Sequence, residues 1–382
     1  INGISTIFYN VYKLLDPKQA CVVTQYISSD QEIKLDKKKK LYRLFFLQDF
    51  RQKRNMRNYV FECIAPYAFF LQLLFVIFKE QPNIICLDDI RWLKIDFSLL
   101  LIKKIFHLPL VVFIHGTDIY TALTKKSMRH QSQLFFLKRV DHILSCSSKA
   151  QSLAIRAGID KKKISIIFPG IDINMFKRKT NLSAFKKNND LCGKRILLTV
   201  SRLEPRKNIE EVLKIMPGLI KNCPHLLYVI IGNGSQRTFL ENLKTNLKLE
   251  GSVLLLGEVK QARLVNWYHA CDVFVLVPKL IKYEDIEGFA IENIEANACG
   301  KPVITNNCGG MTDAIKHNIN GLVLIKPGRK ILEENIVALL THRKFAKQLG
   351  KNGQQIVQKQ FTHTIMVNNL MKLLFNIAQS GK

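Results

Sequence analysis

The sequence predicts an α/β protein of two domains, each built on a parallel sheet. With 382 residues, the chain is longer than a single hydrophobic core usually serves, so about two domains are expected. Short apolar runs alternate with helical patterns along the chain, which is typical of parallel sheets covered by helices. The alternation breaks at Pro169-Gly170 and the polar stretch 177–190, and then it restarts.

The first domain is expected over residues 1–175. Its predicted strands are short, β-branched or aromatic-rich runs bounded by turn or polar residues, at 83–87, 110–114, 142–146 and 164–168. Helical patterns over 64–78 and 99–106 precede two of these strands. The apolar run 64–78 is shorter than the roughly 20 residues that a bilayer requires, so it is interpreted as a buried helix rather than a membrane span.

The second domain is expected over residues 176–355, followed by a C-terminal helix over 356–382 that packs back towards the first domain. Five further runs predict its strands, at 195–200, 227–231, 252–256, 273–277 and 302–305. Ligands of such folds bind at the carboxyl ends of the strands, here in the cleft between the two domains.

The charge of the chain favours anionic partners. Lys and Arg number 58 against 30 Asp and Glu, a net charge of +28. The densest basic run, 34–57, is interpreted first as a solvated loop and second as a patch for anionic lipid headgroups. Nucleic-acid binding is disfavoured because no zinc-finger, RNP or helix-turn-helix signature accompanies the charge.

The nine cysteines form no Cys-x-x-Cys pair, which argues against a zinc site or a redox motif. Most have apolar neighbours, as buried reduced thiols do, so a cytoplasmic protein is expected.

Two acidic residues form the sharpest candidate site. Glu287 follows the expected strand 273–277 at a junction between loop and helix, and Glu295 lies eight residues later. If both sat on one helix, their carboxylates would point the same way, and the free N–H groups at its start would suit an anion. Carboxylates also accept hydrogen bonds from the vicinal hydroxyls of a sugar or a ribose. The alternative is a solvated helix face with an acid near its N-terminus.

Basic residues follow another strand end. Arg202 and Lys207 come after the strand 195–200 and before a helix, where they are suited to bind a diphosphate. An ordinary basic loop is the alternative. In the other domain, His115-Gly116-Thr117-Asp118 follows the strand 110–114, and the Gly makes His115 a better site candidate than an isolated structural histidine.

Two other nucleotide-binding motifs are incomplete in this sequence. Gly232-Asn-Gly234 follows a strand as a dinucleotide fingerprint does, but Arg237 stands where the third Gly belongs. A phosphate-binding P-loop ending at Gly300-Lys301 would require Gly at position 295, which is Glu.

Together these residues resemble retaining glycosyltransferase family 4, whose members have the GT-B architecture of two facing Rossmann-like domains. The segment 287–303 is similar to the two-glutamate motif of that family, 200–208 to its donor-phosphate segment, 115–118 to its His-Gly-(Ser/Thr)-Asp turn and 168–176 to its interdomain linker. Residues 285–289 resemble the phosphatidylinositol mannosyltransferase-like branch.

The chain departs from the family pattern in two places. Members of the family have a Gly-Gly loop after a first strand; Gly3 is expected to correspond to this loop, and the strand before it is missing from the sequence. Ala290 replaces the second Gly of the usual Glu-Gly-Phe-Gly.

The resemblance implies roles for individual residues. Arg202 and Lys207 would neutralise the leaving diphosphate, Glu287 would hold sugar hydroxyls, and His115 would lie near the reacting face of the sugar. Glu295 would hold the ribose. The remaining expected donor contacts are Gly3, Gly232, Val259, Lys260, Gly288, Phe289, Ala290 and Ile291.

The implied reaction transfers a hexose with retention and without metal, from GDP-mannose or a UDP-hexose as co-substrate, with no resident cofactor. Two fixed cations can stabilise a diphosphate leaving group. The expected acceptor is a glycolipid, lipopolysaccharide or polysaccharide precursor, with peripheral contact to the anionic inner face of the cytoplasmic membrane and no nucleic-acid partner. A non-catalytic sugar- or lipid-binding relative is the alternative, and another enzyme of the same architecture, such as a phosphorylase or an epimerase, is the third reading.

Overall fold

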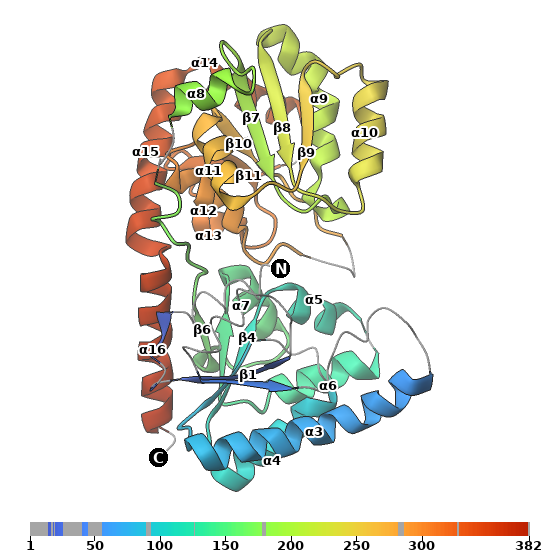
Figure 1. The fold of residues 1–382 in the computed structure, drawn as a ribbon, viewed down its shortest axis with the longest axis vertical. Coiled ribbons are helices and arrows are strands. Elements are labelled where there is room, and N and C mark those ends of the chain that lie inside the picture. Colours follow the sequence, from blue (N-terminus) through green and yellow to red (C-terminus); the bar gives the residue numbers. More distant parts are fainter. Residues whose placement is uncertain are drawn as a thin grey trace.

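Two α/β domains follow one another along the chain and lie one above the other in the computed structural model (Figure 1). The structure describes residues 14–16, 18, 20–25, 40–44, 56–88, 93–125, 127–177, 181–281, 286–326 and 328–380.

The first domain is built on four parallel strands in the order β3-β4-β5-β6. These strands are β3 (Ile85–Leu87), β4 (Leu110–Ile114), β5 (His142–Ser145) and β6 (Ile164–Ile166). All five residues of β4 are buried, as expected for a central strand covered on both faces. The helices of this domain are α3 (Met56–Glu80), α4 (Leu93–Phe106), α5 (Thr117–Thr124), α6 (Met128–Leu137) and α7 (Ser148–Arg156). A second parallel pair, β1 (Cys21–Gln25) and β2 (Lys40–Leu44), precedes them.

The second domain has a six-stranded parallel sheet in the order β12-β11-β10-β7-β8-β9. Its strands are β7 (Arg195–Val200), β8 (Leu226–Ile231), β9 (Val253–Gly257), β10 (Val273–Val275), β11 (Val303–Asn306) and β12 (Gly321–Leu324). Its helices are α8 (Leu182–Lys187), α9 (Ile209–Asn222), α10 (Arg237–Asn246), α11 (Gln261–Ala270), α12 (Ile291–Ala298), α13 (Met311–Ala314), α14 (Arg329–Thr341) and α15 (Arg343–Gln360). The strand order reverses between β7 and β10, and in such sheets the crevice beyond the strand ends at this point receives the ligand.

The expected α/β fold with two parallel-sheet domains is confirmed, and the nine strands predicted from the sequence correspond to β3 through β11. Three strands were not predicted. β12 is a short strand of four residues that begins at Gly321, and β1 and β2 lie in the N-terminal region; no strand was expected in either place.

The chain crosses between the domains twice, and the two crossings lie side by side. Ile171, after β6, accepts a hydrogen bond from the backbone N–H of His363 (2.9 Å) and donates its own to the carbonyl of Phe361 (2.9 Å). The last helix, α16 (His363–Ser380), then runs beside the first domain (Figure 1).

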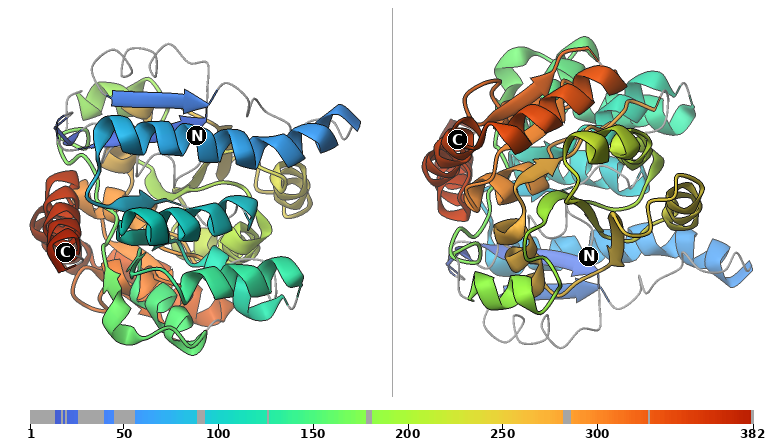
Figure 2. Two further views of the ribbon diagram at one scale, coloured as in Figure 1. Left: turned by 90° about the horizontal axis from the view of Figure 1, so that it is seen from below. Right: turned by 90° about the horizontal axis from the view of Figure 1, so that it is seen from above.

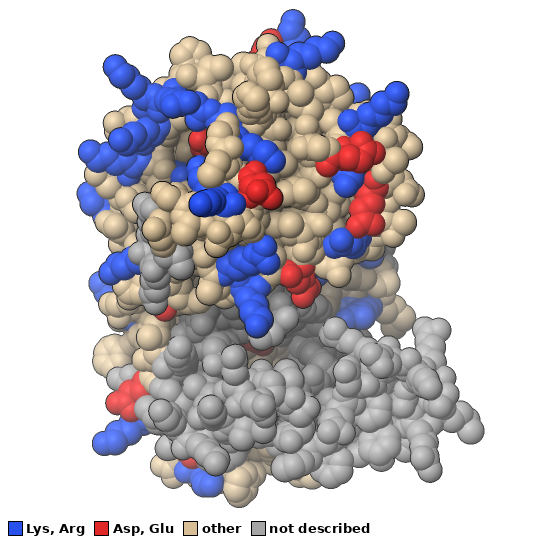
Figure 3. Space-filling model, turned by 45° about the horizontal axis from the view of Figure 1, so that its top comes forward, with Lys and Arg blue, Asp and Glu red and all other residues tan. Residues whose placement is uncertain are grey.

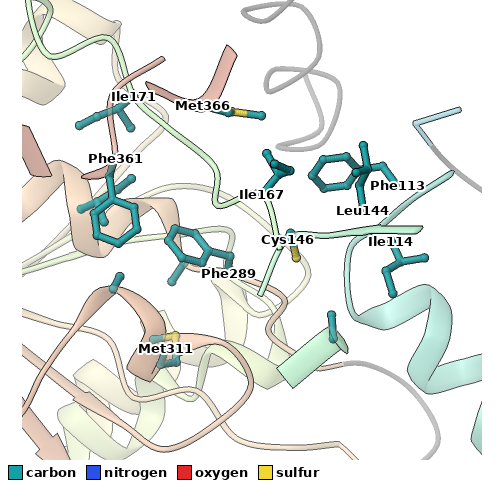
Figure 4. Packing of buried hydrophobic residues seen from close by; sticks show 14 of the residues in the cluster. Phe113, Ile114, Leu144, Cys146, Ile167, Ile171, Phe289, Met311, Phe361 and Met366 are labelled. Carbon is teal, nitrogen blue, oxygen red and sulfur yellow. The ribbon is translucent and has the colours of Figure 1, made fainter. Parts of the chain in front are cut away.

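Three aromatic rings pack at this crossing. Phe168, Phe289 and Phe361 come from three distant segments, and their ring centroids lie 5.7 to 6.0 Å apart. Figure 4 shows Phe289 between Phe361 on one side and Cys146 and Ile167 on the other. One continuous hydrophobic cluster therefore joins parts of both domains.

Two interpretations of the N-terminal half were wrong in part. The run 64–78 lies within α3, which is buried on one side at Leu73, Val76 and Ile77. Tyr67, Leu71, Phe75 and Phe78 of the same run are exposed. The apolar run is longer than one buried stripe requires, so it covers both faces of the helix. In the basic run 34–57, interpreted first as a solvated loop, Lys40–Leu44 is instead a strand paired with β1, and α3 begins at Met56. Residues 34–39 and 45–55 of this run lie outside the described residues. Among the described residues, no helix has the length and apolar character needed to cross a membrane.

We expect Phe361→Ala to lower the free energy of unfolding by about 3 kcal/mol or more, because it leaves a cavity where the domains meet. Phe361 is 1% exposed. Chemical denaturation measures the change, with Phe375→Ala on α16 as the control, since Phe375 is 63% exposed. Equal destabilisation by both variants would contradict the role of the aromatic cluster.

Candidate functional site

A short turn after β7 directs two cations into the protein. Residues Pro205–Lys207 form one turn of 3₁₀ helix, and Asn208 then adopts a left-handed conformation with φ of 57° before α9 begins. The Asn208 side chain donates to the carbonyl of Val277 (3.1 Å), which ties this turn to the segment after β10. Arg206 and Lys207 are consequently buried, with 9% and 4% of their surface exposed.

Both cations contact the carboxylate of Glu287. Arg206 Nη1 donates to Glu287 Oε2, and Lys207 Nζ lies 2.9 Å from the same oxygen. The Glu287 side chain is only 8% exposed. We call these three residues the Glu287 cluster.

The cluster keeps its members charged. Burial disfavours the ionised carboxylate of Glu287, but Lys207 and Arg206 outweigh this effect and hold its pKa below the ordinary value. Burial likewise opposes the charge of Lys207, yet Glu287 and Glu292 raise the pKa of Lys207 above its ordinary value. Lys207 Nζ lies 3.3 Å from Glu292 Oε1.

Arg202 lies at the exposed edge of this arrangement. Its side chain is 59% exposed, and Nη1 lies 2.8 Å from Glu204 Oε1. The other oxygen of Glu204 lies 3.1 Å from Nε of Arg206. Arg202 is thus linked to the Glu287 cluster through one carboxylate without contacting Glu287. Figure 3 shows one face of the molecule, on which Lys and Arg side chains, in blue, cover more of the described surface than Asp and Glu side chains, in red.

His115 lies where the first domain meets the cluster. Its backbone N–H donates to the carboxylate of Asp118 (3.0 Å), and its Nε2 lies 2.8 Å from the carbonyl oxygen of Asp88. The His115 ring stacks on Phe113 with centroids 4.9 Å apart. The histidine is therefore held in one orientation.

The loop that carries Glu287 packs directly on the His115 turn. A Cβ on Gly288 would lie 1.9 Å from the carbonyl oxygen of His115, so only glycine fits there. Thr117 Oγ1 also donates to the carbonyl of Ile286 (3.1 Å). The structure therefore brings Glu287, Lys207 and His115, three of the residues predicted from the sequence, to one place between the domains.

A second contact between the domains lies next to this loop. The Asp313 carboxylate accepts hydrogen bonds from the backbone N–H (2.8 Å) and the hydroxyl (2.6 Å) of Ser148, at the start of α7. The Gly310 N–H donates to the carbonyl of Glu287 (3.1 Å). Both domains thus support the Glu287 loop.

Glu295 has a different environment from the one expected. Because α12 begins at Ile291, Glu287 precedes the helix, and the expectation that one helix face carries both carboxylates is wrong. Glu295 instead accepts a hydrogen bond from the hydroxyl of the buried Tyr268 (2.6 Å). Burial raises the pKa of Glu295 to about 7, and the charge of Glu292 contributes in the same direction.

The other expected donor contacts lie on neighbouring loops. Gly232, after β8, has φ of 135°, and a Cβ there would lie 1.9 Å from the carbonyl oxygen of Ser201. Val259 is half-buried and Lys260 is exposed just before α11. Phe289 and Ala290 are buried and Ile291 is half-buried at the start of α12. Gly3 and Asp285 lie outside the described residues.

Sequence reasoning missed Arg206, Glu292, Tyr268 and Asp313. Arg206 stands in the quoted basic segment, but only the 3₁₀ turn shows that it points inward while Arg202 points outward. Glu292 precedes Glu295 by three residues, a helical spacing that marks it as a neighbour. Among the described residues, no three His, Cys, Asp or Glu side chains are arranged to hold a metal ion.

The raised pKa of Glu295 predicts a pH dependence of stability. A carboxyl whose pKa rises from 4.5 to about 7 on folding binds more protons in the folded state, so it destabilises the protein increasingly as the pH rises from about 5 to about 7. Glu295→Gln removes this titration and retains an acceptor for Tyr268. We therefore expect the variant to gain stability relative to the wild type between pH 5 and pH 8, as measured by urea denaturation. A difference independent of pH would contradict this assignment.

Family models match both domains of this chain. The family model "Glycosyl transferases group 1" matches residues 182–356, and the model "Glycosyltransferase Family 4" matches residues 41–175. The two matches are consecutive and correspond to the two domains of the structure.

Curated relatives are distant. An uncharacterized glycosyltransferase of Methanocaldococcus jannaschii is 26% identical over 272 residues, 68% of this chain and 67% of that protein. A GDP-mannose-dependent alpha-(1-6)-phosphatidylinositol monomannoside mannosyltransferase of Mycobacterium tuberculosis is 28% identical over 210 residues, 54% of each chain. The match therefore spans about half the length of the mycobacterial relative.

The fold has close counterparts among solved structures. HepE of Anabaena, in complex with UDP-glucose, superposes with a TM-score of 0.77 at 17% identity, over 98% of this chain and 96% of that one. This likeness shows the fold, which is the GT-B arrangement of two facing domains. With both of its domains matched by the corresponding family models, the chain belongs to the group 1 glycosyltransferases of glycosyltransferase family 4.

Proposed function

We propose that this protein transfers a hexose from a nucleotide diphosphate sugar to a glycolipid, lipopolysaccharide or polysaccharide-precursor acceptor, with retention and without metal. The observation that carries the proposal is the Glu287 cluster, two buried cations and a carboxylate beyond the strand ends at the point where the strand order reverses. Such a cluster offers positive charge to a diphosphate and hydrogen-bond acceptors to a sugar.

The charge balance of the site suggests how a diphosphate binds. Arg202, Arg206 and Lys207 are offset by Glu204, Glu287 and Glu292. The ion pair of Arg202 with Glu204 is the exposed one, and such pairs contribute only about 0 to 1 kcal/mol. Arg202 can therefore exchange Glu204 for a phosphate oxygen at little cost, while buried Lys207 remains as a fixed charge.

The other residues of the site are assigned to the remaining parts of the donor. Glu287 orients the hydroxyls of the donor sugar, Glu295 holds the ribose, and Val259 and Lys260 border the base. Gly232 and residues 288–291 provide backbone close to the phosphates and the sugar. His115, fixed by Asp118 and Asp88, lies at the reacting face of the sugar. The acceptor attacks from the side of the leaving group, and a donor phosphate oxygen takes its proton.

The relatives give the donor two candidates. The name of the mycobacterial relative specifies GDP-mannose, and the Anabaena structure contains UDP-glucose. We therefore propose GDP-mannose or a UDP-hexose as the donor of this protein, and a lipid-linked glycan as the acceptor. We further propose that the enzyme works in the cytoplasm, in peripheral contact with the inner face of an anionic membrane.

The direct test is to incubate the protein with a panel of nucleotide sugars and lipid-linked acceptors. We expect a nucleoside diphosphate to be released only when both a donor and an acceptor are present. A protein that binds the donor but releases no diphosphate with any acceptor would instead be a non-catalytic relative.

Lys207→Ala should lower kcat by about 100-fold or more, because it removes a buried charge that faces the leaving group. Since breaking a buried ion pair also costs about 3 to 5 kcal/mol of stability, activity is measured at a temperature where circular dichroism shows a folded variant. The control is Lys214→Ala on α9, whose side chain is 33% exposed and pairs with Glu211. Wild-type turnover in folded Lys207→Ala would refute the assigned role.

A nucleoside diphosphate should stabilise the folded protein. At a concentration 100 times the Kd, bound nucleotide adds about 2.7 kcal/mol, which raises the melting temperature by several degrees. Thermal melts with GDP, UDP and ADP identify the base from the largest shift. If none of the three nucleotides raised the melting temperature, the proposed donor class would be wrong.

A further inference from the structure

Helix α3 exposes its apolar side chains to solvent. Tyr67, Leu71, Phe75 and Phe78 are 72%, 65%, 57% and 69% exposed. Their spacing of four, four and three residues places them along one side of the helix. Between residues 67 and 80, Lys79 is the other exposed side chain. The outer side of this helix is therefore aliphatic and aromatic where a solvated helix would be polar.

The neighbouring helices continue this surface. On α4, Phe97, Leu101 and Ile105 are 54%, 49% and 56% exposed at a spacing of four residues. Phe78 of α3 meets Phe106 of α4 edge to face with ring centroids 5.5 Å apart, and Phe97 lies 5.9 Å from Phe135 of α6. Figure 2, in its view from below, shows α3, α4 and α6 side by side across the lower end of the first domain. We call their outer side the α3–α4–α6 face.

Cations border this apolar surface. Lys79 Nζ lies 5.5 Å from the centroid of the Phe75 ring, and the Arg139 guanidinium lies 3.3 Å from that of Phe135. Lys104 is exposed on α4 beside Ile105. Aliphatic and aromatic side chains interleaved with Lys and Arg are typical of helices that lie in the plane of a membrane interface, where the apolar part enters the acyl boundary and the charges reach the headgroups.

We propose that the α3–α4–α6 face docks on the surface of an anionic lipid bilayer. This inference rests on the proposed function only in that it gives the enzyme access to a lipid-linked acceptor. The charge of the surface favours lipid over a second copy of the chain, because a symmetric dimer would press this face, with Lys79, Lys104 and Arg139, against the same cationic face of the other copy. The net charge of +28 adds a repulsion between copies and an attraction to anionic headgroups.

Docking in this orientation leaves the second domain in water. The α3–α4–α6 face lies on the side of the first domain that is remote from the second domain (Figure 1). The Glu287 cluster then remains accessible to a soluble nucleotide sugar while the first domain rests on the membrane.

Vesicle flotation tests the proposal. Vesicles of phosphatidylglycerol and phosphatidylcholine at low salt should carry the wild-type protein to the top of the gradient, and vesicles of phosphatidylcholine alone should carry much less. We expect Leu71→Ser combined with Phe75→Ser to lower the partition coefficient by about tenfold or more, since both side chains lose apolar contact. Phe97→Ser with Leu101→Ser on α4 should act in the same direction, and Lys104→Glu should reduce binding about fivefold or more.

The matched control is Phe239→Ser with Ile325→Ser in the second domain, where the two side chains are 48% and 79% exposed. It should bind vesicles like the wild type. The proposal is overturned if the wild-type protein does not float with anionic vesicles, or if the α3 and α4 variants float as well as the control. It is also overturned if the wild type sediments as a dimer that the α3 variant converts to a monomer, which would identify the face as an interface between copies.

Stabilisation by nucleoside diphosphate, measured on the same variants, separates this proposal from the function. It should be unchanged by the α3 and α4 substitutions, because they lie far from the Glu287 cluster. A wild type that binds vesicles but is not stabilised by any nucleotide would refute the donor assignment and leave the docking surface supported.

Discussion

Glu287 is buried against Arg206 and Lys207, and this ion cluster constrains the architecture around it. A charge removed from water is stable only when a partner of opposite charge stays in contact, and loss of one partner costs about 3 to 5 kcal/mol. The turn Pro205–Lys207 after β7 and the loop before α12 must therefore remain together. These two segments follow strands on either side of the point where the strand order reverses, so the cluster also fixes the shape of the ligand crevice.

The same loop joins the two domains. Gly288 follows Glu287 and packs so closely on the His115 carbonyl that no side chain fits. The backbone N–H of Gly310 donates a hydrogen bond to the carbonyl of Glu287. Asp313 and Ser148 add a second link nearby. Because the loop is seated on the first domain, a movement of either domain changes the surroundings of Glu287. The site is thus a property of both domains in contact.

The sequence predicted the buried strands and the residues that follow them better than it predicted the direction of individual side chains. Continuous β-branched runs identify buried parallel strands such as β4 and β7, whereas β12, only four residues long and starting at Gly321, resembles a turn. Glu287, Lys207 and His115 were found because they follow strand ends, but spacing could not show that Arg206 turns inward and Arg202 outward. Nor could the long apolar run 64–78 reveal that one side of α3 is exposed, since hydrophobicity on all sides of a helix is usually a sign of burial.

A double-mutant cycle on the Glu287 cluster tests the central claim most directly. Glu287→Gln, Lys207→Met and the double variant are compared in free energy of unfolding by chemical denaturation at pH 7. If the buried ion pair is the constraint described above, the losses of unfolding free energy in the two single variants add up to more than the loss in the double variant. The expected difference is about 1 kcal/mol or more. Losses that add within about 0.5 kcal/mol would show that the two residues do not depend on each other, and the account would fail.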